Sequence, residues 1–226
     1  MTRQIHVGGV PIGAGAPVVI QSMLNTKTTD VEGSLSQIRK LAAAGCQIAR
    51  LAVPNQEAAK SFGEICKASP LPLVADIHFV YKLALMAAEG GASKIRINPG
   101  NIGGEDRVQA VVAACKERNI PIRIGVNGGS LDKKLLEKYG HPTAEALVES
   151  AFEHLELLEK YGFYDTCVSM KSSHVPTMVA AARLFRSKCD YPIHIGVTET
   201  GPVRMGLMKS AMGIGALLLD GIGDTI

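Results

Sequence analysis

Tryptophan is absent from this chain, and aromatic residues make up only 4% of it. A hydrophobic core therefore has to be built from aliphatic side chains. Hydrophobic residues account for 46% of the 226 residues and charged residues for 20%. This composition is typical of a soluble globular protein, and the chain is long enough for one sizeable core.

Strong net charge and long apolar runs are also missing. The formal net charge is only +3, and no basic run carries interleaved aromatic residues. The N-terminal sequence MTRQIHVGGV has no apolar segment of the signal-peptide kind, and no stretch approaches membrane-spanning length. We therefore expect no nucleic-acid partner, no membrane partner and a cytoplasmic location.

Closely spaced cysteine pairs are a third absence. The five cysteines are odd in number, widely spaced and never arranged as C-x-x-C, a spacing found in many zinc, redox and iron–sulfur sites. We expect free thiols in a reducing compartment and no metal site in this chain. The cysteines are Cys46, Cys66, Cys115, Cys167 and Cys189.

The chain does contain a regular alternation of two patterns. Short β-branched runs end at polar residues, glycine or proline, and each is followed by an amphipathic segment rich in alanine and leucine. We predict strands at residues 18–22, 48–53, 73–77, 94–97, 122–126, 166–170 and 193–197. We predict helices at residues 31–44, 56–67, 80–89, 105–118, 143–161, 175–185 and 208–219.

This alternation predicts an α/β fold, a (β/α)8 TIM-type barrel formed by one domain over residues 1–226. A doubly wound open sheet is the alternative, but Gly13-Ala14-Gly15 runs into Pro17 and opens no helix, and no Walker A sequence occurs. Gly8-Gly9 between short apolar runs predicts an N-terminal hairpin that plugs the lower end of the barrel. Residues 224–226 resemble the start of strand eight, so we expect a chain truncated there.

The ends of the predicted strands carry the polar residues of interest, because barrel active sites lie at the carboxyl ends of the strands. Side chains alternate along a strand. The isoleucines near residue 96 suit the helix layer, which leaves Lys94, Arg96 and Asn98 facing the lumen. The same alternation turns Arg123 and Asn127 inward on the next strand.

Four cations are therefore expected to converge on one cavity, since Arg50 and Lys171 lie at heights equivalent to Arg96 and Arg123. Burying an unpaired ion is costly. Internal pairing with nearby carboxylates is the structural alternative, but the cations outnumber them. Because the guanidinium fork fits phosphate oxygens, a phosphate-bearing ligand is the simplest account of the whole set.

Other polar residues lie near the same strand ends. Asp76 and His78 close the third predicted strand, and Glu199 follows the seventh but reaches the mouth only if that strand ends first. A carboxylate here is either a counter-charge for the cations or a proton-transfer group. The turns at residues 98–101 and 127–130 present backbone N–H groups to a ligand or serve only as turns. Further candidates for phosphate contact are Ser172, Ser173, Lys209 and Ser210.

Seven motifs occur in order along the chain, and together they closely resemble the bacterial 4-hydroxy-3-methylbut-2-en-1-yl diphosphate synthases. The resemblance covers the whole chain, and PIRIGVNGGSL and KIRINPGN are its most specific parts. The motifs are QSM at 21–23, RLAVP at 50–54, ADIHF at 75–79, KIRINPGN at 94–101, PIRIGVNGGSL at 121–131, GVTE at 196–199 and ALLLDGIGDTI at 216–226.

The resemblance implies an iron–sulfur oxidoreductase of the non-mevalonate isoprenoid pathway. Such enzymes open 2-C-methyl-D-erythritol 2,4-cyclodiphosphate reductively to 4-hydroxy-3-methylbut-2-enyl diphosphate. Electrons arrive from ferredoxin or flavodoxin through a 4Fe–4S cluster, which a separate C-terminal domain holds through cysteines and a glutamate. In the homodimer that domain covers the barrel of the other subunit. The domain is absent from this chain, so we expect the chain alone to be inactive.

The resemblance also implies roles for residues of this chain. Glu199 would be an acid–base group near the reacting carbons. The expected substrate ligands are Arg50, Arg96, Asn98, Arg123, Asn127, Lys171 and Ser172. Three segments depart from the usual family pattern, namely residues 171–174 (KSSH), 78–81 (HFVY) and 198–201 (TETG). The arginine and serine that grip phosphate on the family's eighth strand are also absent.

Two other functions stay open at this point. A pterin-binding barrel of the dihydropteroate synthase type also presents an asparagine and a phosphate site at its mouth, although a pterin site would want more carboxylate and amide groups than are found here. A binding module that holds a phosphate-bearing ligand without chemistry is the second alternative.

Overall fold

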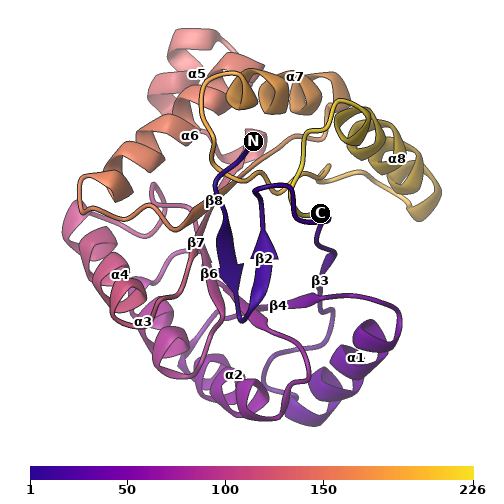
Figure 1. The fold of residues 1–226 in the computed structure, drawn as a ribbon. Coiled ribbons are helices and arrows are strands. Elements are labelled where there is room, and N and C mark those ends of the chain that lie inside the picture. The colour runs from indigo at the N-terminus through magenta and orange to yellow at the C-terminus, as the bar shows by residue number, and fades with distance from the viewer.

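A curled parallel sheet forms the centre of the protein, and the computed structural model describes all residues 1–226. Six strands are hydrogen-bonded in the order β3-β4-β5-β6-β7-β8, which is also their order along the chain. Figure 1 shows them inside a ring of helices. Their bounds are β3 Gln21–Met23, β4 Ile48–Ala52, β5 Leu73–Asp76, β6 Lys94–Ile97, β7 Ile122–Asn127 and β8 Thr166–Lys171.

Isolated backbone bridges complete the ring between β8 and β3. Ile193 bridges to Val168 of β8, and Thr225 bridges to both His194 and Val19. All of these bridges are parallel, like the pairs within the sheet. The chain near residues 193 and 225 thus takes the seventh and eighth positions around the axis. The predicted (β/α)8 TIM-type barrel is confirmed.

Two predicted strands differ from the observed ones. The strand expected at 18–22 begins only at Gln21, because Val19 pairs through a single bridge to Thr225. The strand expected at 193–197 is wrong as a regular strand, since only Ile193 and His194 form bridges there. Residues 193–197 lie between β8 on one side and residues 224–226 on the other, but single bridges, Ile193 to Val168 and His194 to Thr225, are the pairing they make.

Eight α-helices surround the sheet. Side-chain caps begin several of them, as when Asp30 accepts a hydrogen bond from Gly33 N–H and Asn55 accepts one from Ala58 N–H. None of the helices combines the length and apolar character needed to cross a membrane. The helices are α1 Val31–Ala43, α2 Gln56–Ala68, α3 Tyr81–Glu89, α4 Glu105–Glu117, α5 Lys133–Tyr139, α6 Ala144–Glu159, α7 Val175–Arg186 and α8 Val203–Leu219.

Two helical features were not predicted. Helix α8 begins at Val203 instead of residue 208, directly after Pro202, and Gly206 weakens the helical pattern of its first turns. The short helix α5 follows Asp132, whose carboxylate accepts a hydrogen bond from Lys134 N–H. A 3-10 turn, η1 Gly128–Ser130, joins β7 to this region.

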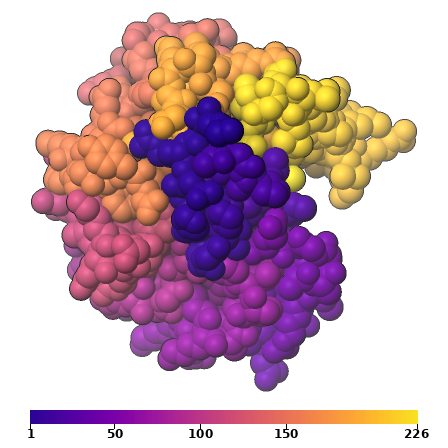
Figure 2. All heavy atoms as spheres, in the orientation of Figure 1, coloured from indigo at the N-terminus to yellow at the C-terminus, as the bar shows by residue number.

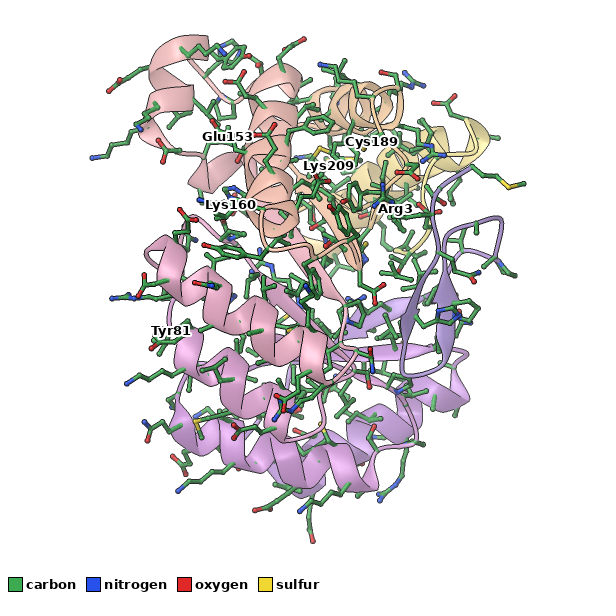
Figure 3. The ribbon with its side chains drawn as sticks, turned by 60° about the vertical axis from the view of Figure 1, so that its left-hand side comes forward. Arg3, Tyr81, Glu153, Lys160, Cys189 and Lys209 are labelled. Carbon is green, nitrogen blue, oxygen red and sulfur yellow. The ribbon has the colours of Figure 1, made fainter.

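A large apolar core of 49 buried residues lies between the strands and the helices. It includes Ile95, Ile97 and Ile124, which alternate along β6 and β7 with the polar residues of the lumen. Figure 3 shows neighbouring helices packed side by side over this layer. The strand alternation predicted from the sequence therefore separates an aliphatic outer layer from a polar interior.

The N-terminal hairpin closes one end of the lumen, as predicted. Strands β1 Ile5–Val7 and β2 Val10–Ile12 pair antiparallel, and Gly8 and Gly9 make the turn with φ of 54° and 87°. Figure 2 shows the hairpin covering the centre of that face. Its buried side chains form a second apolar cluster with Val19, Ile48, Val74 and Cys167.

Candidate functional site

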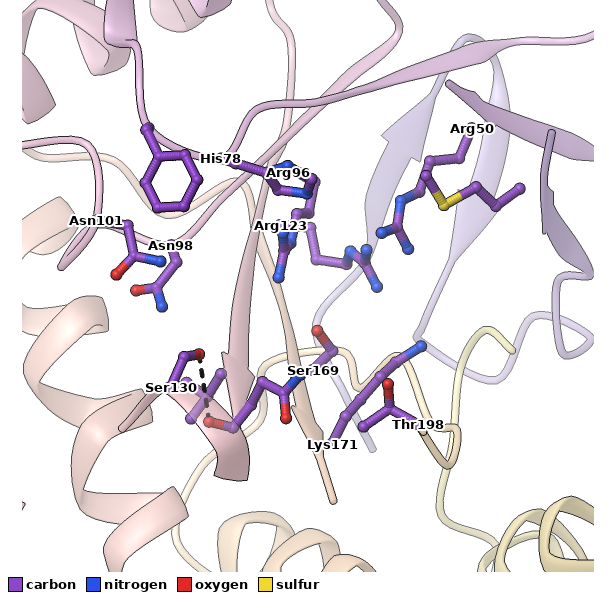
Figure 4. A pocket seen from close by; sticks show the side chains of 14 residues that line it. Arg50, His78, Arg96, Asn98, Asn101, Arg123, Ser130, Ser169, Lys171 and Thr198 are labelled. Atoms are coloured by element: carbon purple, nitrogen blue, oxygen red, sulfur yellow. Dashed lines mark hydrogen bonds between the residues drawn. The ribbon is translucent and has the colours of Figure 1, made fainter. Parts of the chain in front are cut away.

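A polar pocket of about 520 Å³ opens at the carboxyl ends of the barrel strands. Cationic, amide and hydroxyl side chains dominate its walls, and Figure 4 shows several of them directed toward the same space. Four cations line it, Arg50, Arg96, Arg123 and Lys171; three amides, Asn98, Asn101 and Asn127; three hydroxyls, Ser130, Ser169 and Thr198; and His78.

Strand register sets the positions of the cations along the lumen, with Lys171 four residues beyond the level of Arg123. Arg96 of β6 lies opposite Arg123 of β7, and Lys171 of β8 lies opposite Asn127 of β7. Gly125 leaves room for the Arg96 side chain, because a Cβ at this position would collide with the Arg96 guanidinium. A glycine on the lumen face of β7 therefore lets an arginine from the neighbouring strand lie across it.

Asp76, at the end of β5, is the counter-charge for two of the four cations. Its side chain is fully buried and contacts Arg50 at 2.7 Å and Arg96 at 3.1 Å. His78 Nε2 lies 3.2 Å from the same carboxylate. Burial alone would raise the pKa of Asp76, but the His78 hydrogen bond and the charges of Arg50 and Arg96 lower it. Asp76 is thus held ionised among cations.

Arg123 and Lys94 have no such partner. Arg123 is 1% exposed, and its Nε and Nη1 atoms make no hydrogen bond. Lys94 is fully buried deeper in the barrel, and its Nζ is also without a partner. Burial and the charges of neighbouring guanidiniums lower the pKa of both side chains, that of Lys94 to about 7. The interior therefore carries more positive charge than its own carboxylate neutralises.

Lys171 adds a titratable amine to the pocket wall. Burial lowers its pKa to about 7, and the charges of Arg123, Arg50 and Arg96 act in the same direction. No carboxylate forms an ion pair with it. An anion entering the pocket would reverse the effect of the three guanidiniums and favour the ammonium form.

Two asparagine side chains present donors to the pocket. Asn98 Oδ1 accepts a hydrogen bond from Gly100 N–H at 3.1 Å, and Asn127 Oδ1 accepts one from Gly129 N–H at 3.1 Å. Because each oxygen is engaged by its own turn, each amide nitrogen is left for a ligand. The local turn chemistry thus fixes the amide orientation.

Four of the candidate phosphate ligands, Ser172, Ser173, Lys209 and Ser210, lie outside the pocket wall. Ser172 is buried, and its Oγ accepts a hydrogen bond from His174 N–H at 3.1 Å. Lys209 points along the surface, where its Nζ lies 3.5 Å from the Ser173 carbonyl. Ser210, the next residue of α8, is not among the pocket residues either.

Glu199 is exposed just beyond the pocket. The chain leaves the sheet before this residue, which has a left-handed φ of 51°. Its carboxylate lies close to Gly129 at the mouth, about 4 Å from where a Cβ of that glycine would be. Glu199 forms no ion pair with Arg50 or Arg96, which are taken by Asp76. Its place at the mouth is compatible with contact to a bound ligand.

Several lining residues were missed in the sequence. Ser169 lies two residues before Lys171 on β8, so the alternation that placed Lys171 inward would have found it as well. Thr198 follows the irregular segment after His194, and strand alternation says nothing about its direction. Met23 and Phe79 contribute apolar wall that no pattern singled out.

The thiols of this chain do not fit an iron–sulfur cluster. Such a cluster needs several cysteine ligands converging on one point. Burial raises the pKa of Cys66 and Cys115 to about 12. No group of three or more histidine, cysteine, aspartate or glutamate side chains is arranged to hold a metal ion. All five cysteines are free and belong to separate segments of the chain.

Comparison with proteins of known structure shows the fold alone. Dihydropteroate synthase from Yersinia pestis superimposes with a TM-score of 0.70 at 11% identity, covering 100% of this chain and 91% of that one. A 3-dehydroquinate dehydratase from Geobacillus kaustophilus gives 0.69 at 12% identity, covering 100% and 88%. These proteins share the barrel fold with this chain, but at such low identity the likeness says nothing about a shared functional site.

Sequence relatives are much closer. A 4-hydroxy-3-methylbut-2-en-1-yl diphosphate synthase (flavodoxin) from Idiomarina loihiensis is 58% identical over 225 residues, which cover 100% of this chain and 60% of that protein. The protein of the same name from Thermodesulfovibrio yellowstonii is 59% identical over 225 residues, which cover 100% of this chain and 64% of that protein. This chain thus spans less than two thirds of these relatives. The family model of the GcpE TIM-barrel domain matches residues 2–226, and the chain belongs to that family.

Proposed function

We propose that this chain is the substrate-binding barrel of an enzyme that reductively opens 2-C-methyl-D-erythritol 2,4-cyclodiphosphate to 4-hydroxy-3-methylbut-2-enyl diphosphate. One observation carries the proposal. Four cations line a single pocket whose only paired carboxylate is Asp76. A ligand with two phosphoryl groups would supply the missing negative charge. The names of the sequence relatives support the same product, 4-hydroxy-3-methylbut-2-enyl diphosphate.

The pocket residues divide by what they offer the diphosphate. Arg50, Arg96 and Arg123 would donate charged hydrogen bonds to phosphate oxygens, and Lys171 would add a fourth cation. Asn98 and Asn127 would donate through their free amide nitrogens. Ser172, Lys209 and Ser210 do not line the pocket, so in this chain they would act on the ligand only indirectly or after local movement.

The redox part of the reaction would come from outside these residues. A 4Fe–4S cluster would be held by a further domain of a longer protein, since the cysteines of this chain do not converge. The names of the relatives favour flavodoxin as the electron donor, with ferredoxin as the alternative. A cytoplasmic homodimer belongs to the same proposal. The share of the residues described here is to bind and orient the diphosphate.

The pterin alternative is not favoured. The resemblance to dihydropteroate synthase is one of fold at 11% identity, whereas the family match covers residues 2–226. We expect titration calorimetry to show binding of the cyclodiphosphate to this chain and no binding of 7,8-dihydropterin. Binding of the pterin with no heat from the cyclodiphosphate would contradict the proposed function.

Affinity for the cyclodiphosphate is expected to fall as the pH rises above about 7. Lys171 has a pKa of about 7 in the empty pocket, and a bound anion raises it. Below pH 7 the Lys171 amine is already charged before the ligand binds, so the affinity is steady. Above pH 7 the amine must take up a proton when the ligand binds, and the affinity falls by up to about tenfold per pH unit. Calorimetry from pH 6 to 9 measures this slope, because the diester phosphates of the ligand do not titrate there.

The matched control for this pH dependence is Lys171→Arg, which keeps a charge at all these pH values. Its slope should be smaller, and the remainder would come from Lys94, whose pKa is also about 7. An equally steep slope in the variant would show that Lys171 is not the titrating group.

Glu199→Gln is expected to depress turnover of the full-length enzyme by 100-fold or more while changing substrate affinity less than about threefold. The reason is its location, since the carboxylate lies at the mouth without a cation to neutralise. Steady-state kinetics and calorimetry separate the two effects. Normal turnover of the variant would show that Glu199 takes no part in the reaction. The face around Glu199 would then serve ligand binding only.

A further inference from the structure

A hydrogen bond joins the pocket to the helical layer behind it. His154, in the middle of α6, has its Nε2 atom 2.8 Å from Asn98 Oδ1. The two residues are 56 positions apart in the sequence. The ring also packs against the turn that follows Asn98, because a Cβ on Gly100 would lie 3.5 Å from its Cε1 and Nε2 atoms.

The turn settles which atom of the Asn98 amide faces His154. Gly100 N–H can only donate, and it lies 3.1 Å from the same Asn98 atom, which must therefore be the oxygen. An oxygen that accepts from Gly100 can also accept from His154, so Nε2 of the ring carries the hydrogen. The Asn98 oxygen is thus held by two donors, and the amide nitrogen is left without a protein acceptor at the pocket wall.

The imidazole is suited to this task because it stays neutral. Burial lowers the pKa of His154 to about 4, and Asp132 is the charged group that opposes this effect. A neutral ring donates from Nε2 without adding another cation behind a wall that already holds four. Asn98 itself is buried and has little room to turn. Without His154, only the Gly100 N–H would oppose a reversed amide that presents its oxygen to an anion.

We propose that His154 is a positioning residue of the pocket, which holds Asn98 with its amide N–H groups directed at a phosphate oxygen of the ligand. This inference rests on the proposed function insofar as the ligand is a diphosphate. His154 does not line the pocket and does not touch the ligand. It acts through Asn98, and its effect should vanish when Asn98 is removed.

A double-mutant cycle with inorganic diphosphate as the probe tests the coupling. His154→Leu should weaken diphosphate binding about three- to tenfold, the range expected for one uncharged hydrogen bond. In an Asn98→Ala background the same change should have no further effect. His154→Gln, whose amide can donate from a similar position, should recover most of the affinity. His6→Leu, on the hairpin at the other end of the barrel, is the matched control and should bind like the unchanged chain.

A spectroscopic readout separates positioning from a merely structural role. Long-range 1H–15N spectra should show the His154 ring with hydrogen on Nε2 and none on Nδ1 from pH 6 to 8. The amide signals of Asn98 should shift on diphosphate binding in the unchanged chain and lose that shift in His154→Leu. A ring protonated on Nδ1 would overturn the proposal, as would an equal loss of affinity for His154→Leu with and without Asn98.

The outcomes also distinguish this inference from the proposed function. Binding of inorganic diphosphate with the expected coupling, but no binding of the cyclodiphosphate, would leave the His154 role intact and remove the proposed substrate. Binding of both ligands without coupling would overturn the His154 role alone. Failure to bind either would overturn both.

Discussion

Asp76→Asn is expected to destabilise the chain by about 3–5 kcal/mol, the cost of breaking a buried ion pair by removing one partner. The carboxylate is fully buried and holds Arg50 at 2.7 Å and Arg96 at 3.1 Å. An amide of the same shape would leave both guanidiniums buried without a counter-charge. Urea denaturation at pH 7 gives the free energy of unfolding directly, and two-state behaviour is checked by comparing near- and far-UV signals.

A surface aspartate provides the control for this change. Asp190 pairs with Arg3 where both side chains are substantially exposed, so Asp190→Asn should cost less than about 1 kcal/mol. Acidification adds a second readout. The folded-state pKa of Asp76 is lowered, so its contribution is present above the unfolded value of about 4 and is lost as the pH falls below it. Equal stability losses for the two variants would show that Asp76 is not the counter-charge of the pocket.

Arg123→Met is expected to move stability and binding in opposite directions. Arg123 is buried with Nε and Nη1 unpartnered, so replacing it by an apolar side chain of similar length removes an uncompensated charge and should stabilise the empty chain by about 1–4 kcal/mol. The same change removes charged hydrogen bonds to the ligand, at about 1.5–3 kcal/mol each. We expect cyclodiphosphate affinity to fall by 100-fold or more.

Thermal unfolding and calorimetry on the same samples measure the two effects. Arg39→Met, on the exposed face of α1, is the control and should change stability by less than about 0.5 kcal/mol and binding not at all. Unchanged ligand affinity in Arg123→Met would remove Arg123 from the binding site. A large loss of stability would show that Arg123 makes a stabilising interaction within the protein and is not kept there for a ligand.

Asp76→Asn and Arg123→Met both test the excess positive charge of the pocket. Asp76 neutralises part of the positive charge of the pocket. Arg123 and Lys171 have no carboxylate partner and are available to bind an anionic ligand. A site of this kind is less stable empty than occupied. Saturating diphosphate should therefore stabilise the unchanged chain by about 2.7 kcal/mol at 100 times its dissociation constant, and Arg123→Met much less.

Much of this arrangement follows from the sequence alone. Strand alternation is a local property, so the isoleucines of β6 and β7 and the inward Arg96, Arg123 and Asn98 could be read from a few neighbouring residues. The βα repeat and the turn at Gly8-Gly9 are equally local, and they predicted the barrel and its N-terminal plug. The resemblance of the motifs to a known family was confirmed by the family match over residues 2–226.

The tertiary structure decided what crosses from one strand or helix to another. Sequence left Asp76 and Glu199 as equal candidates for a counter-charge, and only the packing of β4, β5 and β6 gives that role to Asp76. The single bridges of Ile193 to Val168 and of His194 to Thr225, in place of a regular strand, depend on neighbours from distant parts of the chain. The contact of His154 with Asn98 spans 56 positions and two layers. Ion pairs and hydrogen bonds depend on distances of a few ångströms in space, whereas sequence patterns fix only the direction in which a side chain leaves its own strand or helix.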